Sequence, residues 1–258
     1  MSFCVYTILY TLEDKKPEEN AYVQMFLLWF AQMAKIGVAS TICLLVDSAT
    51  FEYLNDTSYT LISERIRCNL SVTEFPPPKT HLDGMKMKYT EFDYDEDYLM
   101  YMDIDILALK PLVGLLGEGG DDVDIYLDQE GGIEEHGYLD ALTDSERAIV
   151  LGSGVRLGFS AGKFIIRNKE KGREFFRVIR EHILDNPETT YYSVEQPVFN
   201  RTIFCMGSFL NMHKIDGNLI STNFQNYTEE TILLDFCGDP GNGQLHLNKM
   251  INGITAFT

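Results

Sequence analysis

Two carboxylates one residue apart, Asp103 and Asp105, directly follow an apolar run, and this arrangement favours binding of a divalent metal ion. The run Tyr98–Met102 is too short for a helix and rich in aromatic residues, so we expect a buried strand. In open α/β sheets, ligands collect outside the carboxyl ends of the strands. Because side chains alternate along an extended chain, Ile104 should point into the core and the two carboxylates away from it. The pair therefore suits a hard cation such as Mn²⁺ or Mg²⁺.

Three interpretations of this pair compete. The first is a solvated acidic turn, but an acidic cluster before the strand already supplies surface charge. That cluster comprises Asp93, Asp95, Glu96 and Asp97. The second is a phosphatase with Asp103 as nucleophile and Asp105 as acid. It requires a later Gly-Asp-Asp, and the one at 120–122 follows too soon for a parallel crossover to intervene. The third is a nucleotide-sugar transferase whose metal bridges the donor diphosphate.

Composition limits the class of protein. The chain has 258 residues, of which 45% are hydrophobic and 23% charged, so we expect a single α/β domain with a sizeable core. Its 21 Lys and Arg against 39 Asp and Glu give a net charge of −18. Each contact to a nucleic-acid phosphate needs a Lys or Arg, so the charge argues against nucleic acid as a partner.

The cysteines and the N-terminus favour a cytoplasmic protein. The five cysteines are widely spaced and include no CxxC, so neither a disulfide framework nor a zinc site is indicated. The first residues lack a basic leader and a cleavage pattern, so we expect a strand and not a signal peptide. The most apolar stretch, Ala21–Ser40, contains Gln24, Gln32 and Lys35. It is better explained as a packed helix than as a transmembrane segment.

The first half of the chain has the strand, helix, strand order of a parallel sheet. Predicted elements are a strand at Phe3–Thr11, a helix capped by Asn20 and ending near Gly37, a strand at Thr41–Val46, a helix at Ser58–Ile66, a strand at Asn69–Phe75 and a helix at His81–Phe92. The last of these carries Lys86 and Lys88 and leads into the strand before Asp103. We expect residues 1–112 to form the nucleotide-binding half, which ends with the paired carboxylates.

Residues 113–258 form the expected sugar- and acceptor-binding half. Predicted elements are a strand at Val123–Leu127 ending at Asp128, a helix from the capping box Thr143–Glu146 to Gly152, a strand at Phe159–Arg167, a helix at Lys169–Asp185, a helix opened by Glu195 with Pro197 near its first turn, and a strand at Ile232–Phe236. No strand is expected between residues 129 and 158, and we assign this excursion to acceptor binding.

Taken together, these spaced elements resemble glycosyltransferases of the GT-A fold, and most closely the retaining family of glycogenin and the bacterial lipooligosaccharide galactosyltransferases. Asp103 and Asp105 resemble the family's DxD motif, which binds manganese and the donor diphosphate. The segment Phe159-Ser-Ala-Gly162 is similar to the family's Phe-Asn-Ala-Gly, with Ser160 in place of a sugar-contacting Asn. Glu195-Gln196 is similar to its Asp-Gln pair near the reacting carbon. The implied fold is a Rossmann-like, mostly parallel sheet flanked by helices.

The resemblance also implies roles for individual residues. The implied catalytic residues are Asp128, Glu195 and Gln196. The implied metal ligands are Asp103, Asp105 and Asp235, the last standing where the family has His. The implied nucleotide- and sugar-binding residues are Tyr10, Thr11, Lys88, Asp103, Ser160, Gly162, Gly238 and His246. His246 is also the alternative third ligand of the metal.

The implied function is transfer of a sugar from a nucleotide diphosphate, by resemblance a uridine diphosphate (UDP) sugar, with Mn²⁺ or Mg²⁺ as cofactor. The acceptor is a hydroxyl of a glycan, glycoprotein or small molecule, and the order of motifs favours retention over inversion. Two alternatives stay open: a non-catalytic, cation-dependent nucleotide- or sugar-binding domain on the same fold, and the phosphatase.

Overall fold

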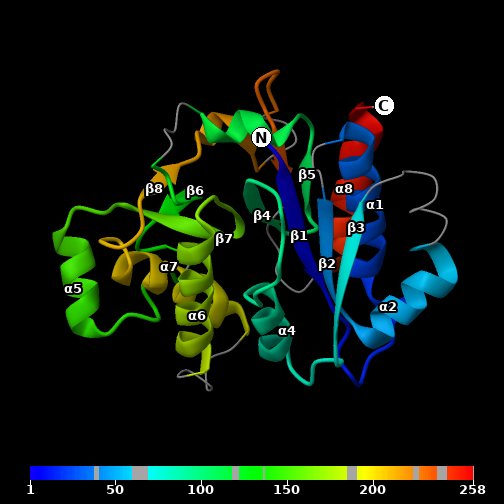
Figure 1. Cartoon of the computed structure of the whole chain (residues 1–258), viewed down its shortest axis with the longest axis horizontal. Coiled ribbons are helices and arrows are strands. Elements are labelled where there is room, and N and C mark those ends of the chain that lie inside the picture. Colours follow the sequence, from blue (N-terminus) through cyan, green and yellow to red (C-terminus); the bar gives the residue numbers. More distant parts are fainter. Residues whose placement is uncertain are drawn as a thin grey trace.

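The computed structural model describes residues 1–37, 41–59, 69–117, 122–135, 137–184, 191–222, 227–236 and 243–257. Its strands are β1 (Phe3–Leu9), β2 (Thr41–Asp47), β3 (Leu70–Phe75), β4 (Tyr98–Met102), β5 (Ile106–Ala108), β6 (Ile125–Gly132), β7 (Leu157–Ile166), β8 (Met212–Lys214), β9 (Ile220–Ser221) and β10 (Leu233–Asp235). Its α-helices are α1 (Ala21–Ile36), α2 (Ser48–Leu54), α4 (His81–Lys88), α5 (Asp144–Gly152), α6 (Lys169–Leu184), α7 (Tyr191–Cys205) and α8 (Gly243–Phe257). Figure 1 shows these elements coloured along the sequence, from blue at the N-terminus to red at the C-terminus.

The strands form two sheets. The larger has seven strands in the order β3-β2-β1-β4-β7-β6-β8, and the smaller has the order β5-β10-β9. β1, β2, β3 and β4 are mutually parallel, whereas β7 runs antiparallel to both β4 and β6. The predicted α/β fold with a mostly parallel central sheet is therefore confirmed, with β7 reversing direction beside the central strand.

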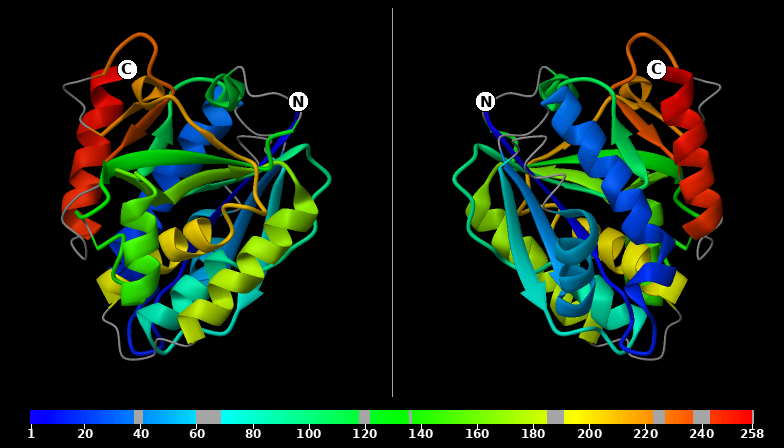
Figure 2. Two further views of the ribbon diagram at one scale, coloured as in Figure 1. Left: turned by 90° about the vertical axis from the view of Figure 1, so that its left-hand side faces the viewer. Right: turned by 90° about the vertical axis from the view of Figure 1, so that its right-hand side faces the viewer.

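Each face of the large sheet is covered by its own helices. Along β1, Val5 and Leu9 pack into a core with residues of α1 and α8, whereas Tyr6 and Ile8 pack into a second core with residues of α6 and α7. This is the two-residue period of a strand buried on both faces. In the side views of Figure 2, α1 and α8 lie on the side of the sheet opposite α6. None of the helices in the described ranges is long and apolar enough to cross a membrane.

Most sequence predictions of elements are confirmed, and their errors are local. Asn20 caps α1, and Gly37 ends it with a φ of 62°. The capping box at Thr143 starts α5. The helix α2, capped by Asp47, is absent from the sequence predictions, and the predicted helix at 58–66 lies largely outside the described residues.

Two boundaries were predicted wrongly near the residues of interest. β6 continues to Gly132, so Asp128 lies inside a strand, at a register shift between Leu127 and Gln129, and not at its end. Pairing with β7 extends β6 through a segment whose Gly and charged residues resemble a loop. Likewise, α7 begins at Tyr191, so Pro197 lies inside the helix and removes one backbone donor there.

A polar network fixes the loop that follows β1. The buried carboxylate of Asp47 accepts hydrogen bonds from the backbone N–H of Thr11, at 2.8 Å, and of Thr50, at 3.0 Å. The Asn20 side chain donates to the Tyr10 carbonyl and to the Thr11 hydroxyl, each at 3.0 Å, while accepting from the Tyr22 N–H. Asn20 thus joins the start of α1 to the end of β1.

Asn20→Ala should lower the free energy of unfolding by about 1–2 kcal/mol, because the helix loses its cap and the loop loses two donors. Asn20→Asp keeps the cap acceptor and should cost less. Urea unfolding of both variants tests this order, and an equal loss in the two would contradict the role given to the cap.

Candidate active site

The paired carboxylates lie in a tight turn between β4 and β5. The N–H of Asp103 donates to the Gly162 carbonyl at 2.9 Å, and the Ile106 N–H donates to the Asp103 carbonyl at 3.1 Å. The Phe236 N–H donates to the Asp105 carbonyl at 3.0 Å, which fixes the turn to the small sheet. Ile104 is buried in the core, as predicted from the alternation. Both sheets therefore hold the backbone of this turn.

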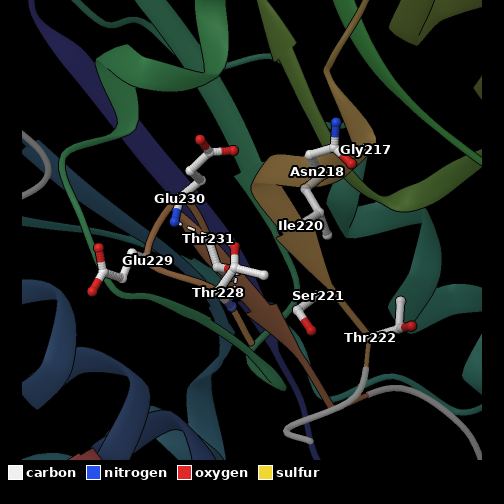
Figure 3. Close-up of a pocket in the computed structure, with 9 residues that line it drawn as sticks. All are labelled: Gly217, Asn218, Ile220, Ser221, Thr222, Thr228, Glu229, Glu230 and Thr231. Atoms are coloured by element: carbon white, nitrogen blue, oxygen red, sulfur yellow. Dashed lines mark hydrogen bonds between the residues drawn. The ribbon is translucent and has the colours of Figure 1, made fainter. Parts of the chain in front are cut away.

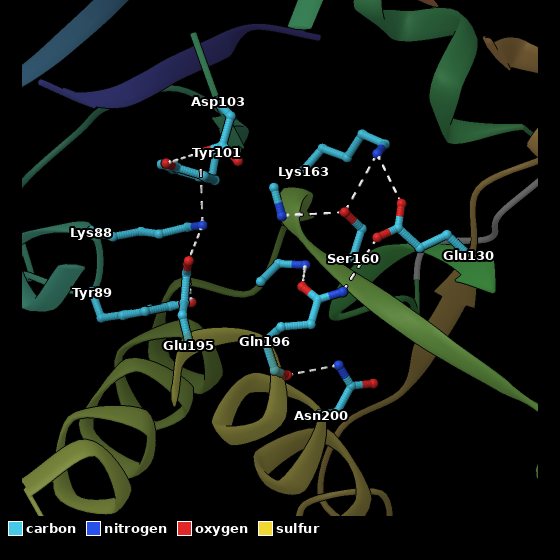
Figure 4. Close-up of polar contacts among 12 residues, drawn as sticks. Lys88, Tyr89, Tyr101, Asp103, Glu130, Ser160, Lys163, Glu195, Gln196 and Asn200 are labelled. Atoms are coloured by element: carbon cyan, nitrogen blue, oxygen red, sulfur yellow. Dashed lines mark hydrogen bonds and ion pairs between the residues drawn. The ribbon is translucent and has the colours of Figure 1, made fainter. Parts of the chain in front are cut away.

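A buried lysine, Lys88 at the end of α4, links Asp103 to α7 (Figure 4). Its Nζ contacts a carboxylate oxygen of Glu195 and lies 3.9 Å from Oδ1 of Asp103. The hydroxyl of Tyr89 donates to the same Glu195 oxygen at 3.2 Å, and the hydroxyl of Tyr101 donates to Asp103 Oδ1. The Lys88 side chain is 1% exposed, so its ammonium needs partners inside the protein. These partners are the two carboxylates and the Tyr101 ring, whose centroid lies 3.8 Å from Nζ.

The carboxyl group of Asp103 has an altered acidity. Desolvation of the carboxyl group, which lies against Tyr101 and Gly162, raises its pKa from 3.8 to about 7. The charge of Lys88 opposes the shift, and the charges of Asp105 and Glu195 add to it. The side chain still has 42% of its surface exposed, so a ligand can reach it from solvent. A cation placed here would favour the ionised form.

A second buried lysine, Lys163 on β7, joins carboxylates from β6 and β10. Its Nζ lies 2.6 Å from Asp235 Oδ2, 2.9 Å from Asp128 Oδ2 and 3.6 Å from Glu130 Oε2. It also donates to Ser160 Oγ at 3.4 Å. Burial lowers the pKa of Lys163, but attraction to these carboxylates leaves the pKa well above its ordinary value. Its ammonium therefore stays charged although it is fully buried.

Two side-chain amides of α7 form hydrogen bonds with the backbone of β7. Gln196 Oε1 accepts from the Ala161 N–H at 2.8 Å, and its Nε2 donates to Glu130 at 3.3 Å. One turn later, Asn200 accepts from the Phe159 N–H and donates to the Phe159 carbonyl, both at 2.8 Å. Gln196, a predicted catalytic residue, is therefore a fixed group of the site in this structure.

Close backbone approach explains the glycine at 162. A Cβ at this position would lie 2.7 Å from Asp103 Oδ2. The N–H of Gly162 donates to Ser160 Oγ at 3.2 Å, so the two predicted sugar-binding residues of β7 contact each other, and Gly162 lies beside Asp103. A small residue at 162 was predicted to let a ligand come close to the backbone. In the structure it is the Asp103 carboxylate that lies close to the backbone there.

The metal ligands predicted by resemblance are only partly brought together. Asp105 Oδ2 lies 3.3 Å from Nδ1 of the buried His246, whereas Asp235 contacts Lys163. Within the described residues, no group of three His, Cys, Asp or Glu side chains could hold a metal ion. Mg²⁺ is commonly held by one or two carboxylates together with substrate phosphates. Asp103 and Asp105 fit a metal of that kind, and Asp235 as third ligand stays a prediction.

The predicted base-binding residues lie at the end of β1, and only one faces α4. The Tyr10 ring packs on Gly84, whose added Cβ would come within 2.5 Å of it, and the Tyr10 hydroxyl lies 3.2 Å from His81 Nδ1. Thr11 is 4% exposed and belongs to the network of Asp47. Gly238 lies outside the described residues.

Sequence reasoning missed Lys163, Asn200 and Tyr89. Lys163 left a signal, because a charged residue inside the apolar strand Phe159–Ile166 needs a buried partner. Asn200 follows Gln196 by four residues, which places both amides on one helical face. Tyr89 left no signal, since an aromatic residue after a helix is ordinary core.

A separate cavity of about 530 Å³ lies along β9 (Figure 3). Its lining is rich in hydroxyl and carboxylate groups. The residues are Gly217, Asn218, Ile220, Ser221, Thr222, Thr228, Glu229, Glu230 and Thr231. Because β9 pairs in parallel with β10, with Ser221 opposite Leu234, the Thr222 end of this cavity is the end nearer Asp235.

The mostly parallel sheet, with Asp103 and Asp105 in a turn after its central strand, is the arrangement expected from the sequence resemblance to the GT-A fold. Comparison with solved structures agrees. The chain matches the galactosyltransferase LgtC in complex with donor and acceptor sugar analogues, with a TM-score of 0.58 and 13% identity, over 98% of this chain and 95% of LgtC. It matches mouse xyloside xylosyltransferase 1 with a TM-score of 0.53 and 9% identity, over 95% of this chain and 92% of that one.

It also matches the bifunctional glycosyltransferase WbbM, with a TM-score of 0.59 and 12% identity, over 98% of this chain but only 49% of WbbM. No family model matches the chain, and no curated protein sequence matches it significantly. The resemblance to glycosyltransferases is therefore confirmed at the level of the fold, over nearly the whole chain.

Gly162→Ala should destabilise the protein by about 1–3 kcal/mol, because the new methyl group overlaps the Asp103 carboxylate. Gly152→Ala is the matched control, since a Cβ there meets nothing within 4 Å. It should be neutral or slightly stabilising. Urea unfolding measures both, and equal stabilities would contradict the close approach of β7 to Asp103.

Asp103→Asn should be more stabilising at pH 8 than at pH 4. Because the folded-state pKa is raised from 3.8 to about 7, the native state binds the proton more tightly, and stability falls as pH rises through that window. Asp97 is the control, because bonds from Ser2 lower its pKa and its contribution is lost as pH falls. Asp97→Asn should therefore show the opposite trend in thermal unfolding, and a profile of Asp103→Asn parallel to wild type would refute the shift.

Proposed function

We propose that this protein is a metal-dependent glycosyltransferase that moves a sugar from a UDP-sugar to an acceptor hydroxyl, with retention of configuration. The observation that carries the proposal is the turn of Asp103 and Asp105 at the end of β4, held beside buried Lys88 and Glu195 within a GT-A-type fold. LgtC was solved with donor and acceptor sugar analogues, which supports the same class of ligands here.

The nucleotide diphosphate would lie between the β1 loop and this turn. Asp103 and Asp105 would hold Mn²⁺ or Mg²⁺ together with the phosphates. The metal would supply charge neutralisation for the departing diphosphate. Tyr10 would contact the base, and Lys88 would attract the phosphates from its position beside Asp103. His246 would orient Asp105, which its Nδ1 contacts at 3.3 Å.

The sugar would lie over β7, near Ser160, Asp128 and Gln196. The transition state of glycosyl transfer resembles an oxocarbenium ion, which carries positive charge. Asp128 would stabilise that charge, and Gln196 would fix the opposite side of the pocket through its bonds to Ala161 and Glu130. Another similar structure is an active-site mutant of LgtC in which Gln is replaced by Glu, so the active site of LgtC contains a Gln.

The contacts of Glu195 favour retention over inversion. An inverting enzyme needs a carboxylate base on the far side of the sugar. The Oε1 of Glu195 instead contacts Lys88 and accepts from Tyr89. A retaining reaction needs no strong protein base, because the departing phosphate can take the proton of the acceptor hydroxyl.

For the acceptor we propose a glycan, glycoprotein or small molecule that approaches from the hydroxyl-lined cavity along β9. Cytoplasmic localisation is part of the same proposal, and the free cysteines support it. Cys4 and Cys43 are buried thiols, and Cys205 is an exposed one.

A non-catalytic donor-binding domain on this fold is the second candidate, favoured by the contact of Asp235 with Lys163 where a third metal ligand was expected. It predicts metal-dependent UDP binding without release of UDP from UDP-galactose, UDP-glucose or UDP-xylose. A phosphatase would cleave phosphate monoesters and ignore all three. The fold comparisons favour glycosyl transfer over a phosphatase.

Calorimetric titration with UDP should give binding that requires Mn²⁺ in the wild-type protein and is abolished in Asp103→Ala, because the carboxylates and the diphosphate share the metal. Glu229→Gln, in the cavity along β9, is the control and should bind like wild type. Binding of UDP that is equally strong without metal would contradict the metal assignment. No binding of UDP or guanosine diphosphate under either condition would contradict the donor site.

A further inference from the structure

We propose that Lys163 is a positioning residue of the sugar pocket. Its ammonium joins Asp235 to Asp128, so that Asp235 helps to orient Asp128 and does not hold the metal. This inference rests on the proposed function, since it assigns the sugar pocket of that reaction. It also explains why the carboxylate expected as third metal ligand lies against an ammonium group.

The contacts of Lys163 saturate its ammonium. An ammonium group has three N–H donors. Three acceptors lie within hydrogen-bond distance: Asp235 at 2.6 Å, Asp128 at 2.9 Å and Ser160 at 3.4 Å. Figure 4 shows the Lys163 side chain reaching toward Ser160 and Glu130, away from the Lys88 cluster. Lys163 therefore connects residues of β6, β7 and β10 that are far apart in the chain.

Burial makes these contacts mutually dependent. Lys163 is 0% exposed, and the side chains of Asp235 and Asp128 are 4% and 6% exposed. A buried charge that loses its partner is costly, so loss of the Lys163 ammonium leaves both carboxylates uncompensated. Loss of the Asp235 charge removes the nearest of the groups that hold this ammonium in place. The position of Asp128 is thus set by Lys163, and that of Lys163 by Asp235, its nearest partner.

The backbone allows this arrangement to orient Asp128. The register shift between Leu127 and Gln129 interrupts the β6–β7 ladder at Asp128, and such a shift turns a side chain away from the regular alternation. Without the ladder to fix it, the carboxylate needs a side-chain partner. Lys163 itself is fixed, because it pairs with Met102, one residue before Asp103. The sugar pocket is therefore placed relative to the metal-binding turn.

The same contact argues against Asp235 as a metal ligand. Its Oδ2 lies 2.6 Å from Lys163 Nζ, and a divalent cation on that carboxylate would face the ammonium across it. Like charges so close together in a buried site repel strongly. Within the described part of the chain, no ammonium lies that close to Asp103 or Asp105, since Lys88 is 3.9 Å from Asp103.

The test compares Lys163→Met, Asp235→Asn and their combination. Three quantities are measured for each variant. The first is the Mn²⁺ concentration that gives half-maximal UDP binding, and the others are kcat and KM for release of UDP from the UDP-sugar that the wild type hydrolyses fastest. We expect kcat to fall about 10- to 100-fold in both single variants, because Asp128 is misplaced. The double variant should lose no more than either single one, since both break one unit. The Mn²⁺ requirement should stay unchanged.

The matched controls are Lys171→Met and Asp124→Asn. They break a 2.6 Å ion pair between Lys171 and the buried Asp124, which lies outside the proposed sugar pocket. The controls should lose stability but keep kcat, whereas Lys163→Met should lose kcat. This pattern would show that Lys163 positions the site and that its effect is not general destabilisation.

The outcomes distinguish this inference from the proposed function. An increase of about tenfold or more in the Mn²⁺ requirement of Asp235→Asn would make it a metal ligand and overturn the inference. Unchanged kcat in Lys163→Met would also overturn it. Wild-type protein that binds no UDP with Mn²⁺ would overturn the proposed function itself, before any variant is compared.

If the variants fail to fold, a crystal structure of the wild type with Mn²⁺ and UDP decides. Asp235 on Lys163 and outside the coordination shell of the metal supports the inference. Asp235 as a ligand of the metal overturns it.

Discussion

The candidate site depends on one constraint: carboxylates that are fully or partly withdrawn from water need a cation beside them. Lys88 supplies it for Glu195 and faces Asp103, and Lys163 supplies it for Asp128 and Asp235. Both lysines are almost fully buried, so neither carries charge for solubility. The two ammonium groups allow acidic side chains to gather where the two sheets meet.

β7 fixes the position of these two clusters relative to each other. It runs antiparallel to both neighbours, so its backbone pairs with β4 before Asp103 and with β6 around Asp128. Gly162 on this strand touches Asp103, and the next residue, Lys163, reaches Asp128. An insertion or a register slip in β7 would therefore disturb both clusters together.

The sequence predicts those features of the fold and the site that depend on residues close together in the chain. The buried strand before the paired carboxylates, the Asn20 cap and the first strands depend on neighbouring residues, and these predictions agree with the structure. The extension of β6 through Asp128 depends on pairing with a strand some 30 residues away, so local composition indicated a loop. Lys163 was missed because its partners come from three strands, and only the fold brings them together.

The balance of charge in the site bears on how it could bind an anionic donor. Among the described residues, the ion pairs of the two clusters join two ammonium groups to a larger number of carboxylates, which are Asp103, Asp128, Glu130, Glu195 and Asp235, with Asp105 beside His246. A diphosphate would meet net repulsion in such surroundings unless a cation accompanied it. The same excess of negative charge would stabilise a sugar that becomes positive as its bond to phosphate breaks. Metal-assisted binding of the donor and charge stabilisation of the sugar, both parts of the proposed function, would thus follow from one acidic site, which the lysines hold together without neutralising it.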